Sequence, residues 1–182
     1  AATPAAAIVW ALIGLVVGSF LNVVIHRIPQ MMQRDSDNYM AMENDEPPPQ
    51  AHRYNLLAPR SACPAYGHQL SAMENIPVVS YLWLRGRCSE CRAPISPRYP
   101  AVELLTAALS ALVVWQLGSS LQGLAALVLV WMLIALTFID IDTQMLPDDL
   151  TLPLIWLGLL VNLSGGFVPL SDAVIGAAAG YL

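Results

Sequence analysis

The segment from residue 118 to residue 139 carries no charged side chain and is followed directly by a carboxylate, Asp140. It reads GSSLQGLAALVLVWMLIALTFI. Because about 20 apolar residues in a helix cross a bilayer, the segment is long enough to be a membrane span. An ionisable group at the edge of hydrocarbon is costly, and acids in such places commonly serve function. The sequence therefore predicts a membrane helix that ends at a functional carboxylate.

Further apolar segments of helical length flank this run. The five predicted helices cover, approximately, residues 6–25, 101–117, 121–139, 150–163 and 172–182. Charged residues make up only 12% of the chain and hydrophobic residues 57%, whereas soluble domains are about a quarter charged. We therefore expect an all-α polytopic membrane protein, a transmembrane helix bundle with a small cytoplasmic domain inserted between helices 1 and 2. The last segment is too short for a full span, so we expect an incomplete chain.

The distribution of positive charge predicts the topology. All eight cations are arginines, and they lie between Arg27 and Arg98. Because arginine-rich loops stay cytoplasmic, the region between the first two spans is expected in the cytoplasm. The predicted units are transmembrane helix 1 at 1–27, a cytoplasmic domain at 28–100 and a transmembrane core at 101–182. Counting spans from there places Asp140 at the cytoplasmic boundary.

Within the cytoplasmic domain, the polar stretch at 36–50 is expected to be a flexible loop, because it is rich in acids and prolines. Residues 54–99 contain enough aromatic and apolar residues for a small folded unit that resembles a zinc knuckle. Cys88-Ser-Glu-Cys91 has the spacing of a zinc ligand pair, and Cys63 begins a second such turn. Because structural zinc takes four ligands, His68 is the candidate that would complete a Cys3His set. The alternative is a vestigial site with free thiols.

Carboxylates are the strongest candidates for chemistry. Asp140 and Asp142 lie two residues apart, so they cannot face the same side if the helix continues through both. A desolvated acid without a cationic partner has a raised pKa, which suits general acid–base catalysis or proton transport equally. Asp148 and Asp149 follow Pro147, and either they support the site or they lie in a solvated turn.

Three polar residues at the ends of the first two spans also have two interpretations. Asn22 and Arg27 lie at the base of the first span, where a snorkelling arginine alone explains the pattern. Glu103 begins the second span, where an acid in the first turn suits the helix dipole.

Several motifs in a fixed order resemble a known family. They are GSFLNVVIHRIP at 18–29, CP…GH at 63–68, ENIP at 74–77, CxxC at 88–91, RYPAVELLTA at 98–107 and FIDIDTQMLPDDLTLPLIWLGLLVN at 138–162. Together they resemble the bifunctional type IV prepilin peptidases of type IV pilus and type II secretion systems, over essentially the whole chain. These peptidases use a second aspartate, in a Gly-x-Gly-Asp motif that this sequence lacks, so we expect the chain alone to lack peptidase activity.

The resemblance implies a bacterial inner-membrane enzyme. It would cleave the leader of prepilins or pseudopilins with two aspartates and then methylate the new N-terminus with S-adenosylmethionine. Asp140 matches one catalytic aspartate, with Asp142 and Asp148 in support, and Asn22, Arg27 and Glu103 are the methyltransferase candidates. Membrane lipid and components of secretion or pilus assembly are the expected partners, and nucleic acid is not.

One departure from the family pattern concerns metal. Tyr66 stands where a fourth cysteine is usual, so the zinc set of many relatives is incomplete. Two other classes of function remain as alternatives. A membrane scaffold needs no catalytic aspartate, and a proton-coupled carrier would use Asp140 but leave the cysteine motifs without a role.

Overall fold

The chain is an all-helical membrane protein, as its sequence predicts. The computed structural model describes residues 3–49 and 53–181. Its helices are α1 (Pro4–Glu43), the short 3-10 helix η1 (Met73–Asn75), α2 (Val79–Trp83), α3 (Arg98–Leu117), α4 (Leu121–Thr143), α5 (Asp148–Leu163) and α6 (Leu170–Tyr181). Within these described residues, β-structure is confined to two isolated bridges. Three helices, α1, α3 and α4, are long and apolar enough to cross a membrane.

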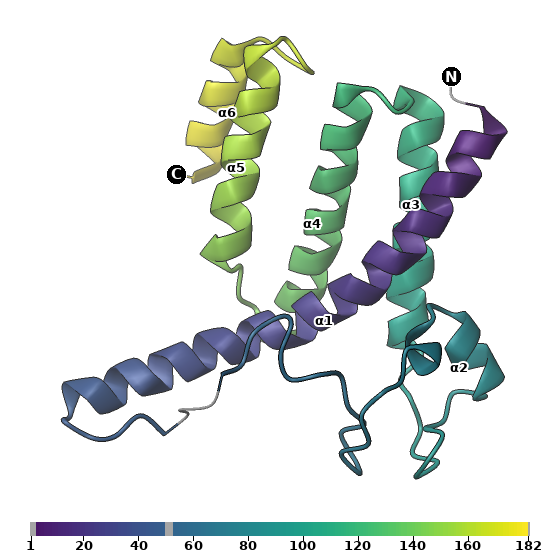
Figure 1. Cartoon of the computed structure of the whole chain (residues 1–182). Helices are drawn as coiled ribbons and strands as arrows, with labels where there is room; N and C mark the ends of the chain where they lie inside the picture. The colour runs from purple at the N-terminus through teal and green to yellow at the C-terminus, as the bar shows by residue number, and fades with distance from the viewer. Residues whose placement is uncertain (1–2, 50–52, 182) are drawn as a thin grey trace.

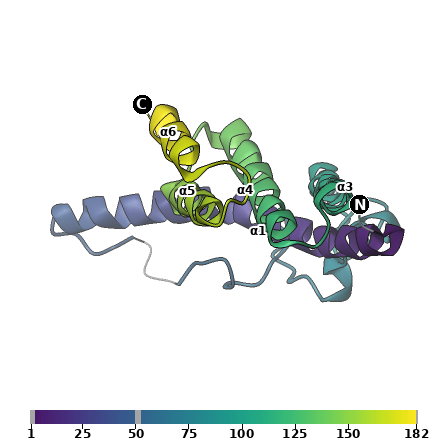
Figure 2. The same cartoon turned by 90° about the horizontal axis from the view of Figure 1, so that it is seen from above.

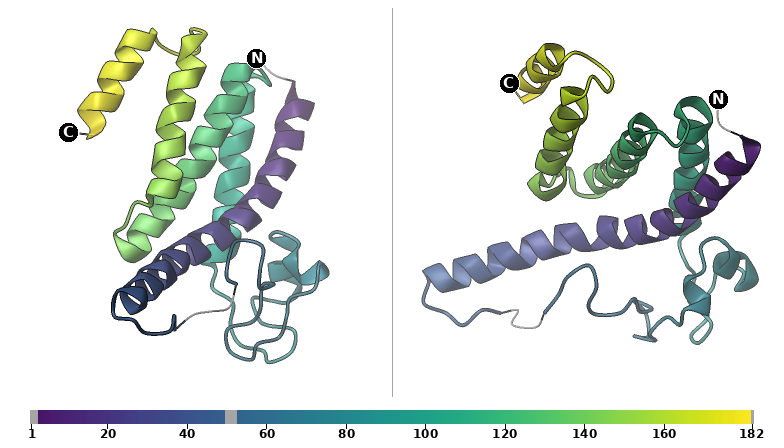
Figure 3. Two further views of the ribbon diagram at one scale, coloured as in Figure 1. Left: turned by 60° about the vertical axis from the view of Figure 1, so that its left-hand side comes forward. Right: turned by 45° about the horizontal axis from the view of Figure 1, so that its top comes forward.

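Helices α3 to α6 stand side by side, and α1 crosses obliquely beneath them (Figure 1). The first half of α1 runs along α3, and its second half passes under α4 and extends beyond α5 (Figure 2). The end of α4, the start of α5 and the insertion that carries α2 all lie at the same end of the bundle (Figure 3). This arrangement places Asp140 on the same side as the arginine-rich region, which agrees with the span count from sequence.

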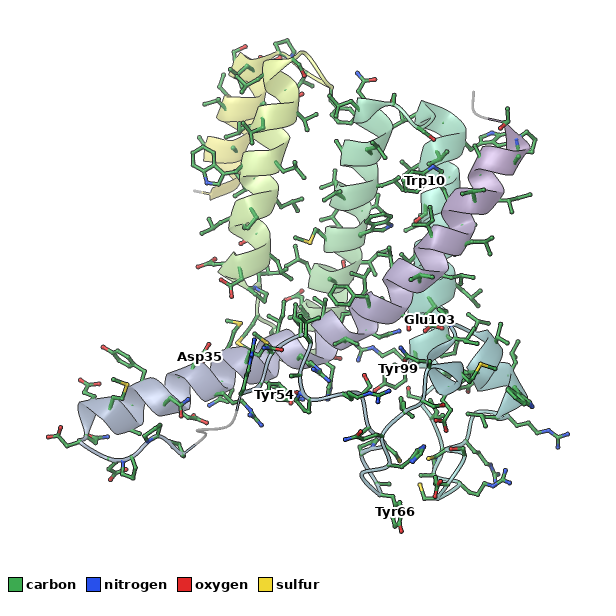
Figure 4. All side chains as sticks on the ribbon, viewed as in Figure 1. Trp10, Asp35, Tyr54, Tyr66, Tyr99 and Glu103 are labelled. Carbon is green, nitrogen blue, oxygen red and sulfur yellow. The ribbon has the colours of Figure 1, made fainter. Side chains whose placement is uncertain are left out.

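Two glycines one helical turn apart allow α1 and α3 to touch. A Cβ atom added to Gly18 would lie 2.7 Å from the Cα of Glu103, and one added to Gly14 would lie 2.8 Å from the Cα of Ala107. Only a residue without a side chain fits at such distances, which is how small residues bring membrane helices together. One turn before Gly14, the indole of Trp10 donates to Ser119 Oγ, which follows α3, at 3.1 Å; Figure 4 labels Trp10.

The buried core lies where α1 crosses the bundle. It is formed by side chains from four helices, namely Leu21, Val24, Ile25 and Ile28 of α1, Val102 of α3, Ile134, Ala135, Leu136 and Ile139 of α4, and Leu150 of α5. Higher in the bundle, the Trp131 indole donates to Ser110 Oγ at 2.9 Å and links α4 to α3. The core therefore holds the last turn of α4 against α1, and this contact positions the carboxylates that follow.

Helix α1 is longer than the sequence predicted. The expectation of a flexible loop over 36–50 is wrong for residues 36–43, which continue α1 through Pro29 to Glu43. A proline inside a helix removes one backbone hydrogen bond but does not always end the helix. After Pro29, the segment contains no glycine or further proline until residue 47, and Gln33 donates to Asp37 one turn later at 2.8 Å. The membrane boundary at residue 27 stays a prediction, because the helix itself has no break there.

Candidate functional sites at one end of the bundle

The end of α4 is tied to the start of α3 through Arg98. Its guanidinium Nη1 lies 2.7 Å from Asp142 Oδ1, and Nη2 donates to the carbonyl of Phe138 at 3.4 Å. The Arg98 Cζ atom also lies 5.0 Å from the centre of the Phe138 ring. One cation therefore fixes the side chain of Asp142 and the backbone one turn before it.

Asp140 lies between Phe138 and Asp142 in the sequence, but its side chain does not pair with Arg98. Helix α4 continues through Thr143 and closes at Gln144, whose backbone adopts the left-handed conformation and donates to the Asp140 carbonyl at 2.8 Å. Because the helix is unbroken, Asp140 and Asp142 face different sides, as predicted. Asp142 faces the arginine, and no ion pair in the described part of the chain includes Asp140. The Asp140 carboxylate is exposed and available for another group.

The two aspartates that follow Pro147 form the first turn of α5. Asp148 and Asp149 are both exposed, and the Thr151 hydroxyl lies 3.5 Å from Asp148 Oδ1. Acids in a first turn are favoured by the helix dipole. Their placement agrees with the solvated-turn interpretation, and a supporting role for Asp148 stays a prediction.

The cysteines lie in two turns of the same construction. In the first, Cys63 N–H donates to His68 O, and residues 62 and 69 form a bridge. In the second, Cys88 N–H donates to Ala93 O, and residues 87 and 94 form a bridge. Each pairing recurs 25 residues later in the sequence, so the fold makes Tyr66 the counterpart of Cys91.

These two turns bring the three thiols together. The sulfur atoms of Cys63, Cys88 and Cys91 all lie within 4.8 Å of one another, and Cys63 Sγ lies 3.6 Å from Cys91 Sγ. Tetrahedral zinc–thiolate bonds of about 2.3 Å would hold sulfurs about 3.8 Å apart. The three thiols therefore fit a thiophilic metal as three of its ligands.

The fourth position of the set is where the two turns differ. Tyr66 is 72% exposed and its side chain points away from the domain (Figure 4). His68 is not part of the thiol group, and its Nε2 lies 3.3 Å from Glu74 Oε1. The structure thus brings together the three cysteines of the predicted ligand set and places the histidine beside a carboxylate.

Glu74 links both turns to η1. It accepts the Ser71 backbone N–H at 2.8 Å and the hydroxyl of Ser89, which lies between Cys88 and Cys91. The Ser89 hydroxyl, followed by the Ser71 N–H, lowers the pKa of Glu74 to about 2. In the second turn, the backbone N–H groups of Cys91 and Glu90 lower the pKa of the Cys88 thiol to about 7.

The three methyltransferase candidates all make contacts between α1, α3 and the insertion. The Asn22 amide donates to the Tyr99 carbonyl at 3.1 Å. Arg27 is only 6% exposed, and it donates to the carbonyls of Asn55 at 2.7 Å and Pro59 at 2.6 Å.

Glu103 is also buried, and one of its carboxylate oxygens accepts the backbone N–H of Val78 at 2.7 Å. The bond joins the first turns of α3 to the start of α2. Figure 4 shows Glu103 and Tyr99 at the base of the bundle, above the cysteine turns. Asn22 and Arg27 on α1 and Glu103 on α3 thus lie along one junction with the insertion.

Sequence reasoning did not assign roles to Arg98 or Glu74. The signal for Arg98 was present, because the span count puts the start of the second span and the end of the third at the same membrane face. An arginine at one edge and an aspartate at the other are then expected to pair. Glu74 belongs to the ENIP motif, but only the fold shows that residues 68 and 89 both approach it.

Comparison with known proteins identifies the family of the chain. Residues 12–117 match the family described as the bacterial peptidase A24 N-terminal domain, and residues 127–182 match the type IV leader peptidase family. The chain is similar to three proteins named prepilin leader peptidase/N-methyltransferase. Identity is 58% to that of Aeromonas hydrophila, 53% to that of Pseudomonas aeruginosa and 53% to that of Neisseria gonorrhoeae.

Each of these alignments covers 94% of this chain, and they cover 60%, 59% and 60% of the respective relatives. The chain therefore spans about 60% of the length of the curated relatives that it matches. No solved structure matches it. With the two family matches together extending over most of its residues, the chain belongs to the type IV leader peptidase family.

Proposed function

We propose that the protein cleaves the leader of prepilins or pseudopilins and N-methylates the new N-terminus. The relatives that carry this name share more than half of their aligned residues with the chain. The observation that carries the proposal is the position of Asp140, which ends a membrane helix with its carboxylate unpaired while its neighbour Asp142 is bound to Arg98. An acid in this setting is free to share a proton with a second acid.

The proposed cleavage uses a water molecule held between two aspartates. One aspartate is ionised and takes a proton from the water, while the other is protonated and donates to the carbonyl oxygen of the leader's last residue, a glycine. The water oxygen attacks the carbonyl carbon and forms a tetrahedral adduct, with no covalent bond to the enzyme. The C–N bond then breaks: the leader leaves as a carboxylic acid, and the proton taken from the water passes to the nitrogen, which becomes the new N-terminal amine. Asp140 is the proposed first aspartate. The second belongs to the Gly-x-Gly-Asp motif of the family, which does not occur in these 182 residues.

The proposed setting is the bacterial inner membrane, with the insertion and Asp140 on the cytoplasmic face. All eight arginines of the chain lie between Arg27 and Arg98, and the positive-inside rule assigns this region to the cytoplasm. Components of pilus assembly or secretion are the proposed partners, because they handle the same substrates.

The test of this function is processing of a prepilin by membranes that contain the full gene product. We expect the mature pilin to appear with a methylated N-terminus when S-adenosylmethionine is supplied, as mass spectrometry would show. A protein that leaves the precursor intact under these conditions would exclude the peptidase, and a cleaved but unmethylated product would exclude only the transferase.

We expect the methyl transfer to depend on the junction between α1, α3 and the insertion. S-adenosylmethionine supplies the methyl group, and Asn22, Arg27 and Glu103 are the proposed residues on the protein side. Loss of one hydrogen bond to a charged group costs about 1.5–3 kcal/mol, which is roughly a tenfold or larger change in rate. Glu103→Gln and Arg27→Lys should therefore lower methylation about tenfold or more while cleavage continues.

Mass spectrometry of the pilin N-terminus and gel analysis of the precursor measure the two activities in the same sample. Ser171→Ala, in α6 and distant from the junction in sequence, is the control. Equal loss of both activities in the Glu103 and Arg27 variants would show that these side chains only maintain the fold.

We also propose that the three cysteines hold one zinc ion, with His68 as the fourth ligand. Tyr66→Cys places a thiol at the position equivalent to Cys91, so it should raise zinc retention during chelation. In the unchanged protein His68→Ala should release zinc, but in the Tyr66→Cys background it should not, because four thiolates then complete the site. Elemental analysis before and after chelation measures both effects. Zinc that survives His68→Ala in the unchanged protein would rule out the histidine as a ligand.

A further inference from the structure

Charge in the insertion is divided between two parts. Residues 28–52 contain five acidic residues and one arginine, whereas residues 53–98 contain six arginines and two glutamates. The acidic part includes the far end of α1, which extends beyond α5 (Figure 1). The basic part carries α2 and the cysteine turns. The two parts should therefore respond in opposite ways to an anionic surface.

Helix α2 exposes one apolar face. Val79, Leu82 and Trp83 are three and four residues apart, so they share a side of the helix. Their exposed fractions are 57%, 68% and 72%. Ile76, one turn earlier, is exposed as well. Large apolar side chains grouped in this way mark a surface that binds a partner or a membrane.

The position of α2 identifies the membrane as the surface it faces. The bond between Glu103 and Val78 N–H fixes the start of α2 to the first turns of α3, a membrane-spanning helix. In Figures 1 and 3, α2 lies beside the base of α3, on the side away from α4 and α5. Tyr99 and Leu104, in the first turns of α3, are also exposed. The apolar face thus continues the lipid-facing surface of the span at the depth where tryptophan and tyrosine are enriched.

Two arginines beside α2 complete the surface. Arg85 and Arg87 follow α2 directly and are exposed. Of the residues that the structure describes, none forms an ion pair with either of them. The two acids of this part are otherwise engaged, since Glu74 is bound by Ser71 and Ser89, and Glu90 lies 4.0 Å from His68.

We propose that the surface formed by Ile76, Val79, Leu82, Trp83, Arg85 and Arg87 docks on the anionic headgroups of the membrane that α3 spans. The apolar side chains enter the boundary between headgroups and acyl chains, and the arginines bind lipid phosphates. Such attachment combines burial of apolar area with electrostatic attraction to anionic lipid. It would hold the insertion against the bilayer, at the same end of the bundle as the end of α4, and it does not require the proposed catalytic activity.

Trp83 reports this docking directly. The full gene product is reconstituted into vesicles of phosphatidylcholine alone or of phosphatidylcholine with phosphatidylglycerol, with lipids brominated near the headgroup or deep in the acyl chain. The chain has five tryptophans, so the Trp83 signal is the difference between the protein and Trp83→Phe. We expect this difference to be quenched by the shallow bromines more than by the deep ones and to be protected from acrylamide.

Anionic lipid should strengthen the quenching of Trp83 by brominated lipid. Each arginine near an anionic surface favours attachment about fivefold, so Arg85→Gln/Arg87→Gln should reduce quenching by brominated lipid in the phosphatidylglycerol vesicles. Arg60→Gln/Arg92→Gln removes the same charge from beside the first cysteine turn and from within the second, and it should not reduce this quenching. Full access of Trp83 to acrylamide in both vesicles would overturn the proposal. Protection of Trp83 from acrylamide without quenching by either brominated lipid would also overturn it, since a protein surface would then cover α2.

Discussion

Asp140→Asn should abolish leader cleavage by the full gene product. In a two-aspartate mechanism the first carboxylate binds the water and accepts its proton. The side-chain amide of asparagine is not a base and cannot accept that proton. Loss of a general acid–base group costs about 100- to 10,000-fold in rate, and groups that act as one unit usually stand at the upper end. Processing of a prepilin in membranes, followed over time, measures the change.

Asp142→Asn is the comparison that makes this test specific. Asp142 and Arg98 are 38% and 36% exposed, and such pairs contribute only about 0–1 kcal/mol. We therefore expect cleavage by Asp142→Asn to fall by less than about tenfold. Asp172→Asn in α6 should have no effect. A pilin that has already been cleaved should still be methylated by the Asp140→Asn protein, and normal cleavage by that protein would refute the assignment.

The sequence predicted the membrane helices well because their physics is local. An uncharged run of sufficient length has to be helical in hydrocarbon wherever its neighbours lie. The predicted spans at 101–117 and 121–139 correspond to α3 and α4, and the predictions at 150–163 and 172 onward correspond to α5 and α6. The contact of Gly14 and Gly18 with α3 is of the same local kind, because it depends on residue size at a fixed spacing.

The prediction of a flexible loop was wrong for residues 36–43, which form the last turns of α1. Acidic and polar residues favour a flexible loop on composition, but charge alone does not oppose a helix. Residues 36–43 contain no helix-breaking residue, and a preceding helix provides the nucleus that isolated segments lack. The prolines from residue 47 onward come after the helix has ended at Glu43.

The candidate sites were predictable in part. Sequence spacing indicated that the cysteines would meet and that Asp140 and Asp142 would diverge, since both follow from local geometry. The partner of Asp142 and the contact between Glu74 and Ser89 were not assigned. Arg98 is 44 residues from Asp142 along the chain, and Glu74 is 15 residues from Ser89. Such pairings depend on how helices and turns pack in three dimensions, which a single sequence encodes only indirectly.

Gly18→Leu should prevent the first helix from packing on α3. Even the Cβ atom would approach the backbone Cα of Glu103 to 2.7 Å, and a backbone atom cannot rotate away as the end of a side chain can. Overpacking in a close contact costs about 1–3 kcal/mol, and a leucine that separates two helices should reach the upper end. For a chain of this size that corresponds to a loss of roughly 6–12 °C in the midpoint of thermal unfolding, measured in detergent by circular dichroism.

Gly158→Leu is the matched control, because a Cβ atom on Gly158 of α5 would meet nothing within 4 Å. That variant adds the same side chain to a helix, where leucine is the better helix former, so its midpoint should stay level or rise. The displaced contact also includes Glu103, which holds the start of α2. Gly18→Leu should therefore expose Trp83 to acrylamide in vesicles as well as lower stability. Equal midpoints for the two leucine variants would mean that α1 does not depend on its close contact with α3.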